Sequence, residues 1–512
     1  MASASGIHTE VEIKLDADAG FVVPNLGRLP GVTAVEHGGT AELIAHYVDS
    51  PGLRLARHGT TFRRRTGGKD EGWHLKLPAA KKSGRLEIHE LAGQSVHDVP
   101  PKLLSLVRVQ LRGEPVEPVA RIMTERTILR LKGDGGVVLA EVADDTVTAE
   151  AIGETLTSSS WREIEVELEE GDAQLLEAAR AALLEAGARP ASATSKLQRT
   201  LSQRLAEMTP APSVETPANA DTAGALAVQY LSLQAGALVA EDPHVRLDVR
   251  DGVHQMRVAT RRLRTALATF RPLFTGSGGE QLRDELKWLG GVLGEARDAE
   301  VMRKHLKHDV DRLPADLVLG PVARRVDLEL NEAHQRAYRA LVETLDGERY
   351  LAVVGQLEAF VADPPLSERA AAPASAELRL LVRKTCRRVT KAVGLAEAAG
   401  SPDERDHLLH EVRKAAKRAR YAAEAAQPVI GKPAKRVSAV MEEIQEDLGD
   451  HQDAVVERAW LRDLGVRAFL AGENGFTFGL LHGRTVLRAE HDEREFGRLW
   501  KQARKTVKAW PG

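Results

Sequence analysis

The chain has 512 residues, 43% of them hydrophobic and 28% charged, which is an ordinary composition for a globular protein with two or more domains. It contains one cysteine, Cys386, so an intramolecular disulfide is excluded and a thiolate metal cluster is not expected. The opening residues lack the basic and apolar regions of a signal peptide, and no run approaches about 18 apolar residues, so we expect a cytoplasmic protein without a membrane span.

The net charge of −3 is spread unevenly along the chain. Residues 1–220 hold 25 Lys and Arg against 31 Asp and Glu, whereas residues 221–512 hold 46 against 43. Neither part is basic enough to bind a polyanion through its overall charge. Any such binding must therefore come from local clusters of basic side chains.

Residues 7–205 form the first predicted domain and read mostly as strands. Apolar and polar side chains alternate at 8–15, 42–48, 60–66, 72–77, 85–90, 125–131, 137–142 and 161–168. Glycine-rich turns such as 133–136 separate several of these segments. Many strands at this short spacing predict a sandwich or a barrel.

Charged side chains recur on one face of these strands. Glu10, Glu12 and Lys14 share one face of the first strand, and Val11 and Ile13 share the other. One such strand could be a solvated edge strand. The pattern returns at Arg63 and Arg65, at His74 and Lys76, at Arg85 and Glu87, at Glu141 and Asp145, and at Glu163, Glu165 and Glu167. It predicts a barrel with a charged interior, where basic side chains would hold a polyanion and carboxylates a divalent metal.

A linker with three prolines is predicted at 206–221, and a helical domain at 222–508. Long segments rich in Ala, Leu, Arg and Glu with a 3.6-residue period predict that second domain. The segment 254–264 matches 410–420 with an offset of 156 residues, and 293–299 matches 448–454 with an offset of 155. Two elements kept in order at nearly one offset indicate two equivalent helical units.

Both copies of the first repeated segment place a histidine and basic residues on one stripe of a helix. A single stripe is more simply a solvated face, but like charges at this spacing destabilise a helix unless something neutralises them. His254 and His410 are as easily core histidines as phosphate donors. Aromatic residues make up only 4% of the chain, so base stacking is poorly provided for. The stripes favour a phosphate polymer over single-stranded nucleic acid, while contact with a duplex backbone stays open.

Residues 7–205 resemble the CYTH, or triphosphate tunnel metalloenzyme, superfamily. The resemblance rests on the Glu-x-Glu-x-Lys motif at 10–14 and, in family order, on Tyr47, Asp49, Arg63, Arg65, Lys76, Arg85, Glu87, Asp145, the 163–167 strand, Ser195 and Lys196. It implies an eight-stranded antiparallel β-tunnel that binds a triphosphate together with Mg²⁺ or Mn²⁺.

The same resemblance implies the roles of individual residues. Metal ligands would be Glu10, Glu12, Asp145, Glu165 and Glu167. Triphosphate ligands would be Lys14, Arg63, Arg65, Lys76, Arg85, Arg126, Arg130 and Lys196, and catalysis would involve Glu10, Glu12 and Lys14. Asp145 is preferred to its neighbour Asp144 because it shares a strand face with Glu141, whereas Arg126 and Arg130 are not distinguished.

Residues 222–508 resemble the CHAD domain through the His-x-x-Arg-x-x-x-Arg-Arg-Leu-Arg helix, the Leu-Gly-x-x-Arg-Asp turn at 293–298 and their second copies. In the second turn only the acid is kept, because Gln452 replaces the arginine. The resemblance implies two four-helix units around a basic cavity that binds inorganic polyphosphate. The residues implied in that binding are His254, Arg257, Arg261, Arg262, Arg264, Arg383, Arg387, His410, Arg413, Lys414, Lys417 and Arg420.

These resemblances together imply an inorganic triphosphatase, in which the tunnel hydrolyses a triphosphate and the helical domain binds polyphosphate. Inorganic tripolyphosphate is the simplest substrate. Two alternatives stay open: a polyphosphate-binding protein without enzymatic activity, and a hydrolase or cyclase that acts on a nucleoside or thiamine triphosphate. The fold class alone does not decide among them.

Overall fold

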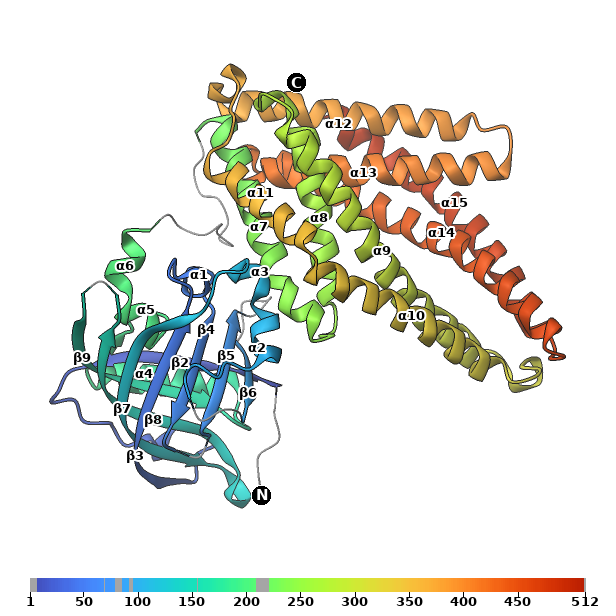
Figure 1. The fold of residues 1–512 in the computed structure, drawn as a ribbon. Helices are drawn as coiled ribbons and strands as arrows, with labels where there is room; N and C mark the ends of the chain where they lie inside the picture. The colour runs from blue at the N-terminus through green and yellow to red at the C-terminus, as the bar shows by residue number, and fades with distance from the viewer. Residues whose placement is uncertain are drawn as a thin grey trace. The chain divides into compact units, whose positions relative to one another are not determined.

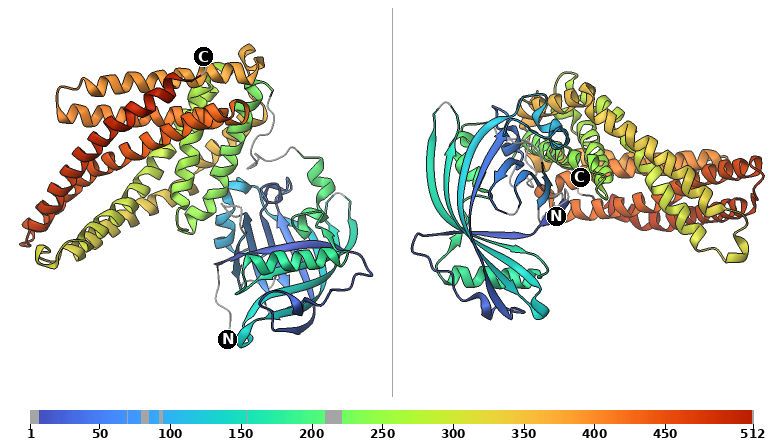
Figure 2. Two further views of the ribbon diagram at one scale, coloured as in Figure 1. Left: turned by 180° about the vertical axis from the view of Figure 1, so that it is seen from behind. Right: turned by 60° about the horizontal axis from the view of Figure 1, so that its bottom comes forward.

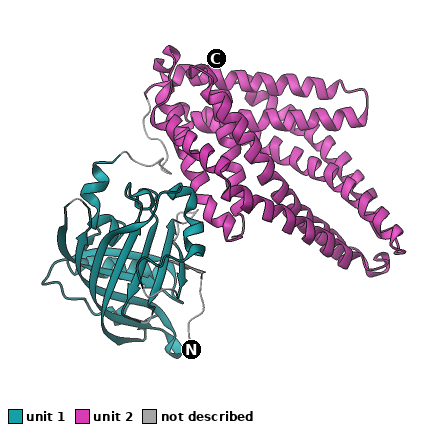
Figure 3. Cartoon of the chain, in the orientation of Figure 1, with its two compact units in different colours: residues 1–211 teal, residues 212–512 magenta. Residues whose placement is uncertain are grey.

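The computed structural model describes residues 7–68, 70–78, 85–91, 95–153, 155–208 and 221–510, apart from the side chains of residues 7–10 and 85. The chain divides into two compact units, residues 1–211 and 212–512, called unit 1 and unit 2 below (Figure 3). Unit 1 contains an antiparallel sheet and unit 2 is built of helices, which confirms the predicted α+β class with two domains. The predicted linker lies mostly outside the described residues, so its limits stay a prediction.

The sheet of unit 1 has ten strands among the described residues, in the order β1-β6-β5-β4-β3-β7-β8-β9-β2-β10. Neighbouring strands are antiparallel throughout. The strands are β1 (Ile7–Glu10), β2 (Glu12–Ala17), β3 (Ala34–Asp49), β4 (Thr61–Thr66), β5 (Gly72–Pro78), β6 (Arg85–Glu90), β7 (Glu117–Lys132), β8 (Val138–Ala151), β9 (Thr157–Leu168) and β10 (Arg189–Pro190). The sheet is strongly bent (Figure 1).

The prediction of a closed barrel with eight strands is wrong, because β1 and β10 are the two ends of the ladder and do not pair with each other. The first predicted strand is divided at Val11. The part before it, β1, pairs with β6, and the part after it, β2, pairs with β9. The Val11 carbonyl still accepts a hydrogen bond from the Leu168 amide at 3.0 Å. One continuous segment therefore borders two distant parts of the sheet, which a sequence period of two could not show.

The outer face of β2, β8 and β9 is covered by α4 (Ala173–Glu185). The helix begins after Asp172, whose side chain accepts from the Leu175 amide at 2.9 Å and so caps the first turn. Leu175, Ala179 and Leu183 pack against outward side chains of the strands, among them Val142, Ile164 and Val166. The two further views show the same helix against the outside of the sheet (Figure 2). Because this face holds the apolar core, the charged face of the same strands is turned inward.

A short helix, α5 (Lys196–Thr200), closes part of the inner face. Its Leu197 and the following Leu201 pack against inward residues that include Ala45, Ile122 and Val147. Ser195 caps the helix by accepting from the Gln198 amide at 3.1 Å. This packing delivers the Lys196 side chain into the interior of the sheet.

Unit 2 contains nine α-helices among the residues that the structure describes. They are α7 (Ala223–Arg246), α8 (Gly252–Thr269), α9 (Gly278–Asp311), α10 (Val322–Asp346), α11 (Glu348–Ala362), α12 (Ala374–Glu397), α13 (Pro402–Ile430), α14 (Lys432–Leu470) and α15 (Phe476–Lys508). The repeated segments fall on α8 and α13 and on α9 and α14. The second repeat has four helices, α12–α15, as predicted. The first has five, because Gly347 adopts an extended conformation (φ −75°, ψ 146°) and separates α10 from α11.

The expectation of no membrane span needs one qualification. Among the described residues, α7 alone is long and apolar enough to cross a membrane by composition. Within its most apolar window, 61% is buried inside the protein. Core helices have the same composition, and the buried Asp242 of α7 forms a 2.6 Å ion pair with Arg246.

Candidate functional site: a charged cavity in unit 1 and a basic cluster in unit 2

The inner face of the sheet surrounds a cavity of about 520 Å³. Its charged lining comes from seven strands and from α5. The described charged residues around it include Glu12, Lys14, Arg63, Arg65, Lys76, Glu87, Arg126, Arg130, Glu141, Glu165, Glu167 and Lys196. Carboxylates dominate where β2, β8 and β9 meet, which we call the acidic side. Arginine and lysine dominate on β4 and β5, which we call the basic side.

Glu165 lies at the centre of the acidic side. The register of β2 and β9 sets it directly opposite Lys14, whose Nζ lies 2.5 Å from Glu165 and 2.8 Å from Glu12. Burial by itself would lower the pKa of Lys14, but Glu165 and Glu12 outweigh it and raise that pKa above its usual value. Burial would raise the pKa of Glu165, yet Lys14, Lys196 and Arg126 hold it well below the usual range. These groups are therefore charged together.

Asp145 organises the two other cations of the acidic side. It is completely buried and accepts two hydrogen bonds from Arg126, at 2.8 and 2.7 Å. The same guanidinium reaches Glu165 at 2.7 Å. Lys196 lies 2.8 Å from Asp145, 2.6 Å from Glu163 and 2.9 Å from Glu165. Burial would lower the pKa of Lys196, but the three carboxylates raise it.

The neighbouring acid, Asp144, faces the other way. It pairs with Arg162 at 2.8 and 2.7 Å, and Arg162 also donates to the Phe21 carbonyl at 2.8 Å. The preference for Asp145 over Asp144 thus agrees with where the two carboxylates lie. Glu163 was recognised as part of the acidic strand but was not selected as a ligand. The sequence contains enough information to place Glu163 in the site, because it shares a strand face with Glu165.

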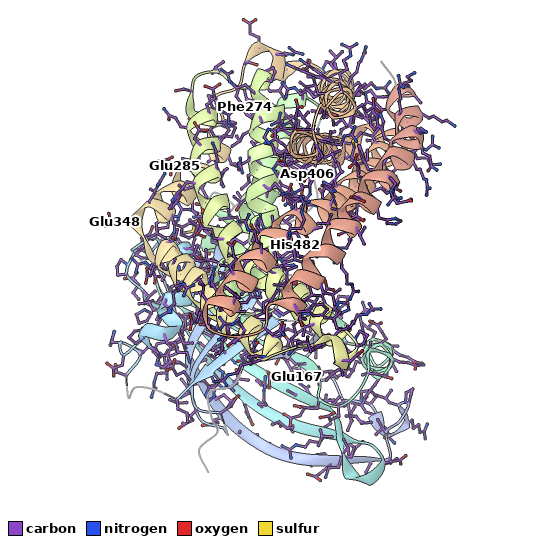
Figure 4. The ribbon with its side chains drawn as sticks, turned by 90° about the vertical axis from the view of Figure 1, so that its right-hand side faces the viewer. Glu167, Phe274, Glu285, Glu348, Asp406 and His482 are labelled. Carbon is purple, nitrogen blue, oxygen red and sulfur yellow. The ribbon has the colours of Figure 1, made fainter. Side chains whose placement is uncertain are left out.

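Glu12 and Glu167 form a second arrangement on the acidic side. They are directly opposite each other across β2 and β9, and both line the cavity. No cation lies within 4.0 Å of Glu167 among the described residues, and Figure 4 labels this residue in unit 1. Burial raises the pKa of Glu167, Lys76 opposes this shift, and the nearby Glu12 raises the pKa further. Like charges directly opposite in a sheet are unfavourable unless something neutralises them.

Carboxylate oxygens fit a hard divalent cation such as Mg²⁺ or Mn²⁺. Asp145, Glu163 and Glu165 place oxygens within 4.8 Å of one another, which is close enough for a metal site. These three acids, however, already hold Arg126 and Lys196. Glu12 and Glu167 are less neutralised by their surroundings, so the donor set favours a metal between these two.

The basic side presents the cations of β4 and β5 to the cavity. Arg63 donates to the Tyr47 hydroxyl at 3.2 Å and lies 4.0 Å from Glu87. Lys76 lies 3.6 Å from the same carboxylate. Arg65 pairs with Asp70, yet burial and the nearby Arg63 lower its pKa to about 9.

Other residues of the first domain are placed less centrally. His74, which sequence reasoning grouped with Lys76 but did not select, lies 2.8 Å from Glu87. Burial lowers the pKa of His74 to about 3, so this imidazole is neutral. Arg130 lines the cavity and binds Glu141 at 3.1 Å. Two further predicted residues, Glu10 and Arg85, pair in register through β1 and β6, but their side chains lie outside the described residues.

In unit 2, four basic residues gather between the two copies of the repeated helix. Arg257 and Arg261 of α8 meet Arg413 and Lys417 of α13, and we call these four the α8–α13 cluster. Burial lowers the pKa of Arg413, Asp453 opposes this shift, and Arg261 and Arg257 lower the pKa further. Burial and the three arginines lower the pKa of Lys417 to about 6. No carboxylate lies within 4.0 Å of Arg413 or Lys417 among the described residues, and the Arg413 Nε is buried without an acceptor.

The repeated Leu-Gly motif explains how α9 and α14 accommodate these arginines. A side chain at Gly294 would meet the Arg257 guanidinium at 3.5 Å, and one at Gly449 would meet that of Arg413 at 3.0 Å. Glycine thus lets each guanidinium lie against the helix backbone. The acid of the motif also has a partner in the first repeat, where Asp298 lies 2.9 Å from Arg257.

Some predicted polyphosphate ligands also hold the helices together. Arg261 donates to the Tyr421 hydroxyl at 2.9 Å, and Arg262 and Arg420 also lie over that ring, 5.5 and 5.7 Å from its centre. Glu424 binds Arg262 at 3.1 Å and Arg420 at 2.8 Å. These two arginines therefore join α8 to α13 through shared partners.

The remaining predicted residues border the cluster or lie beyond it. Burial and Arg297 lower the pKa of His254, and burial and Lys414 lower that of His410, so both imidazoles are mainly neutral at pH 7. Lys414 is paired with Glu411 on the surface. Three others, Arg264, Arg383 and Arg387, lie outside the four-residue cluster.

Comparison with known proteins identifies both parts of the chain. The CYTH domain model matches residues 8–201, and the CHAD domain model matches residues 229–462. Two proteins of Mycobacterium tuberculosis described as uncharacterized, MT2285 and Rv2226, are each 37% identical to the chain over 518 residues, covering 98% of it and 97% of their own length.

Two solved structures share features of the fold at lower similarity. PptA from Streptomyces chartreusis is 23% identical and covers 55% of this chain and all of its own, with a TM-score of 0.47. The CHAD domain from the plant Ricinus communis is 22% identical and covers 59% of this chain and 96% of its own, with a TM-score of 0.45. The assignment rests on the domain models and the full-length relatives: the chain belongs to the family of proteins in which a CYTH domain is followed by a CHAD domain.

Proposed function

We propose that unit 1 hydrolyses a triphosphate, most simply inorganic tripolyphosphate, with Mg²⁺ or Mn²⁺, and that unit 2 binds inorganic polyphosphate. A CYTH domain suggests an enzyme that acts on a triphosphate, by hydrolysis or cyclisation. The observation that carries the proposal is the segregation of charge around one cavity. Carboxylates gather on β2, β8 and β9, and the side chains of Arg63, Arg65 and Lys76 line the cavity from β4 and β5.

The residues of the cavity divide the work of binding. Arg63, Arg65 and Lys76 would hold phosphoryl oxygens from the basic side, since guanidinium and ammonium groups match their charge. On the acidic side, Lys14, Arg126 and Lys196 would exchange their carboxylate partners for phosphate oxygens of the substrate. Catalysis of phosphoryl transfer is mostly positioning and charge stabilisation, which this arrangement supplies.

A divalent metal fits between Glu12 and Glu167, with Glu10 as a further proposed ligand. When bound there, it would offset phosphate charge and lower the pKa of a bound water. Hydrolysis adds the water oxygen to the terminal phosphorus and breaks its bond to the bridging oxygen, so that phosphate and pyrophosphate leave. A protein that only trapped anions would gain nothing from this number of inward carboxylates.

An inorganic substrate suits the described lining better than a nucleotide. Three ring-bearing residues line the described cavity: Tyr47, His74 and His89. Arg63 lies 5.9 Å from the centre of the Tyr47 ring, and the rings of His74 and His89 pack against each other with their centres 4.6 Å apart. Rings that already have these neighbours offer a nucleobase little surface for stacking. This supports tripolyphosphate over a nucleoside triphosphate as the substrate.

We expect Glu12→Gln and Glu167→Gln each to lower metal-dependent phosphate release from tripolyphosphate by about a hundredfold or more, because one lost charge-stabilising group commonly costs that much. Release from tripolyphosphate, ATP and long-chain polyphosphate would be measured with Mg²⁺ or Mn²⁺. Asp144→Asn is the matched control, since it removes a carboxylate from the outer face of the same sheet and should retain activity. Preference for ATP would favour a nucleotide enzyme instead. No turnover of any substrate, together with tight polyphosphate binding, would favour the non-enzymatic alternative.

The proposal for unit 2 rests on the α8–α13 cluster. It has four cations, and two of them, Arg413 and Lys417, have no carboxylate within 4.0 Å among the described residues, although Asp453 raises the pKa of both from a longer distance. A polyanion would supply the missing counter-charge. Among the described residues, Arg261 of the cluster contacts the aromatic ring of Tyr421, and that ring already lies under three arginines.

Binding of polyphosphate to unit 2 should take up protons. Lys417 has a pKa of about 6 in the free protein and is therefore mainly neutral at pH 8, whereas a bound polyanion favours its charged form. Affinity should fall as pH rises above 6, by up to about tenfold per pH unit for this one group. Calorimetry in buffers of different ionisation enthalpy would count the protons. His254 and His410 can also take up protons when the polyanion binds, but they do so at lower pH. Lys417→Arg should therefore remove only the proton uptake that persists above pH 7. An unchanged proton count in that variant would refute this role.

The two motif glycines give a matched test of the cluster. Gly294→Ala should stabilise α9 by up to about 1 kcal/mol, since its new methyl group makes an ordinary 3.5 Å contact and glycine is a poor helix former. Gly449→Ala should stabilise α14 less, because its new methyl group would lie only 3.0 Å from the Arg413 guanidinium. The guanidinium must then move, which should weaken polyphosphate binding. Thermal unfolding and a binding titration would compare them. Equal effects of both substitutions on affinity would contradict the proposed role of Arg413.

A further inference from the structure

The outward face of α12 carries an unusual density of positive charge. Between residues 378 and 396 the helix has six basic residues and no acid: Arg379, Arg383, Lys384, Arg387, Arg388 and Lys391. Like charges three and four residues apart destabilise a helix that stands alone. The buried side of α12 compensates, since Leu378, Val382 and Val389 are packed in the core. Repulsion among these like charges destabilises the helix, and a bound anion would offset that repulsion.

The central cations of this face lack carboxylate partners. No carboxylate lies within 4.0 Å of Arg383, Lys384, Arg387 or Arg388 in the part of the chain that the structure describes. The Arg383 Nε is buried and has no acceptor. By contrast, Arg369 just before the helix is paired with Glu377 at 2.7 Å. Pairing is thus present at the beginning of α12 and absent along its basic middle.

Two adjoining hollows lie along these side chains. The first, of about 180 Å³, is lined by Arg271, Lys384 and Arg388 with two threonines, Thr269 and Thr385. The second, of about 430 Å³, is lined by Arg369, Arg383, Lys384 and Arg387. Both include Lys384, Leu381 and Pro272 in their lining, so they adjoin each other. Neither has an aromatic residue in its lining, so they suit a phosphate chain better than stacked bases.

Positive charge also connects α12 to the α8–α13 cluster. Arg388 is among the groups that lower the pKa of Arg418 on α13, and Arg283 of α9 is another. Arg283 and Arg418 in turn lower the pKa of Arg264 on α8, one helical turn beyond Arg261. Each of four helices thus contributes one arginine to a junction between the two basic regions. Within it, the Arg264 Nε is buried without an acceptor, and its guanidinium lies 3.5 Å from where a side chain on Gly290 of α9 would begin. Arg283 also lies 3.7 Å from Asp284.

We infer that α12 forms a second binding site for inorganic polyphosphate, so that one long chain runs from the α8–α13 cluster across the four-arginine junction to the hollows on α12. This inference rests on the proposed function of unit 2. The row from Arg379 to Lys391 extends about 18 Å along the helix at 1.5 Å per residue. Unit 2 therefore distinguishes long polymers, which occupy both sites, from short ones, which occupy the cluster alone.

The test compares polyphosphates of increasing length on the full-length protein, with a chelator present to prevent hydrolysis. In the wild type, affinity should continue to rise with length after the cluster is filled. In Arg383→Gln/Arg387→Gln, short chains should bind as in the wild type, while long chains should bind at least about tenfold more weakly. The slope of log affinity against log salt should fall by about 1.4 for long chains, at about 0.7 per lost contact. Arg324→Gln/Arg336→Gln on α10 removes two exposed arginines elsewhere and serves as the control.

The outcomes separate this inference from the proposal on which it rests. If Arg413→Gln/Lys417→Gln leaves binding of every length unchanged, the proposed function of unit 2 fails. If that variant weakens binding but the α12 double variant retains the length dependence of the wild type, the second site on α12 is overturned. If single-stranded RNA binds as tightly as polyphosphate of equal charge and is lost equally in the α12 variant, the assignment to a base-free phosphate polymer is overturned. Tripolyphosphate hydrolysis unchanged in the α12 variant would show that unit 1 is intact.

Discussion

The interior of unit 1 depends on the mutual neutralisation of buried charges around Glu165. A buried ion that loses its partner costs several kcal/mol, so Lys14, Arg126 and Lys196 cannot leave this carboxylate without a replacement. A triphosphate can draw the three cations away, but it leaves the acids uncompensated. A divalent cation can compensate the acids, but it leaves the three basic side chains unpaired. The charge distribution therefore favours the arrival of both together.

The basic surfaces of unit 2 differ from the cavity of unit 1 in how their positive charges are compensated. Along α12 and in part of the α8–α13 cluster, cations lie without carboxylate partners in the described structure, so a phosphate chain has no internal ion pair to break there. Binding to that surface requires no metal for charge balance. Like-charge repulsion in the free protein is instead relieved by deprotonation of Lys417 and by contact with solvent. One chain thus combines a compensated cavity with an uncompensated surface.

The sequence predicted which face of a strand each side chain lies on better than it predicted how the strands are connected and paired. The two-residue period of a strand is enough to place Arg63 and Arg65 on the inward face. It also places Asp145 and Asp144 on opposite faces, because the strands pair regularly at these residues. It could not reveal the division at Val11, since both halves keep the same alternation. Nor could it show that Glu12 faces Glu167, because cross-strand register depends on distant turns. The break at Gly347 was likewise hidden within a continuous helical pattern.

The repeat in unit 2 has diverged at the positions that matter for charge. Arg257 in the first copy is paired with Asp298 at 2.9 Å, whereas the equivalent acid of the second copy, Asp453, raises the pKa of Arg413 from more than 4.0 Å away. The second copy also has Lys417 where the first has Arg261, and a lysine can lose its proton on burial while an arginine remains charged. The first copy therefore supplies a permanently charged and partly paired half of the cluster. The second supplies the half whose charge a bound phosphate chain can restore.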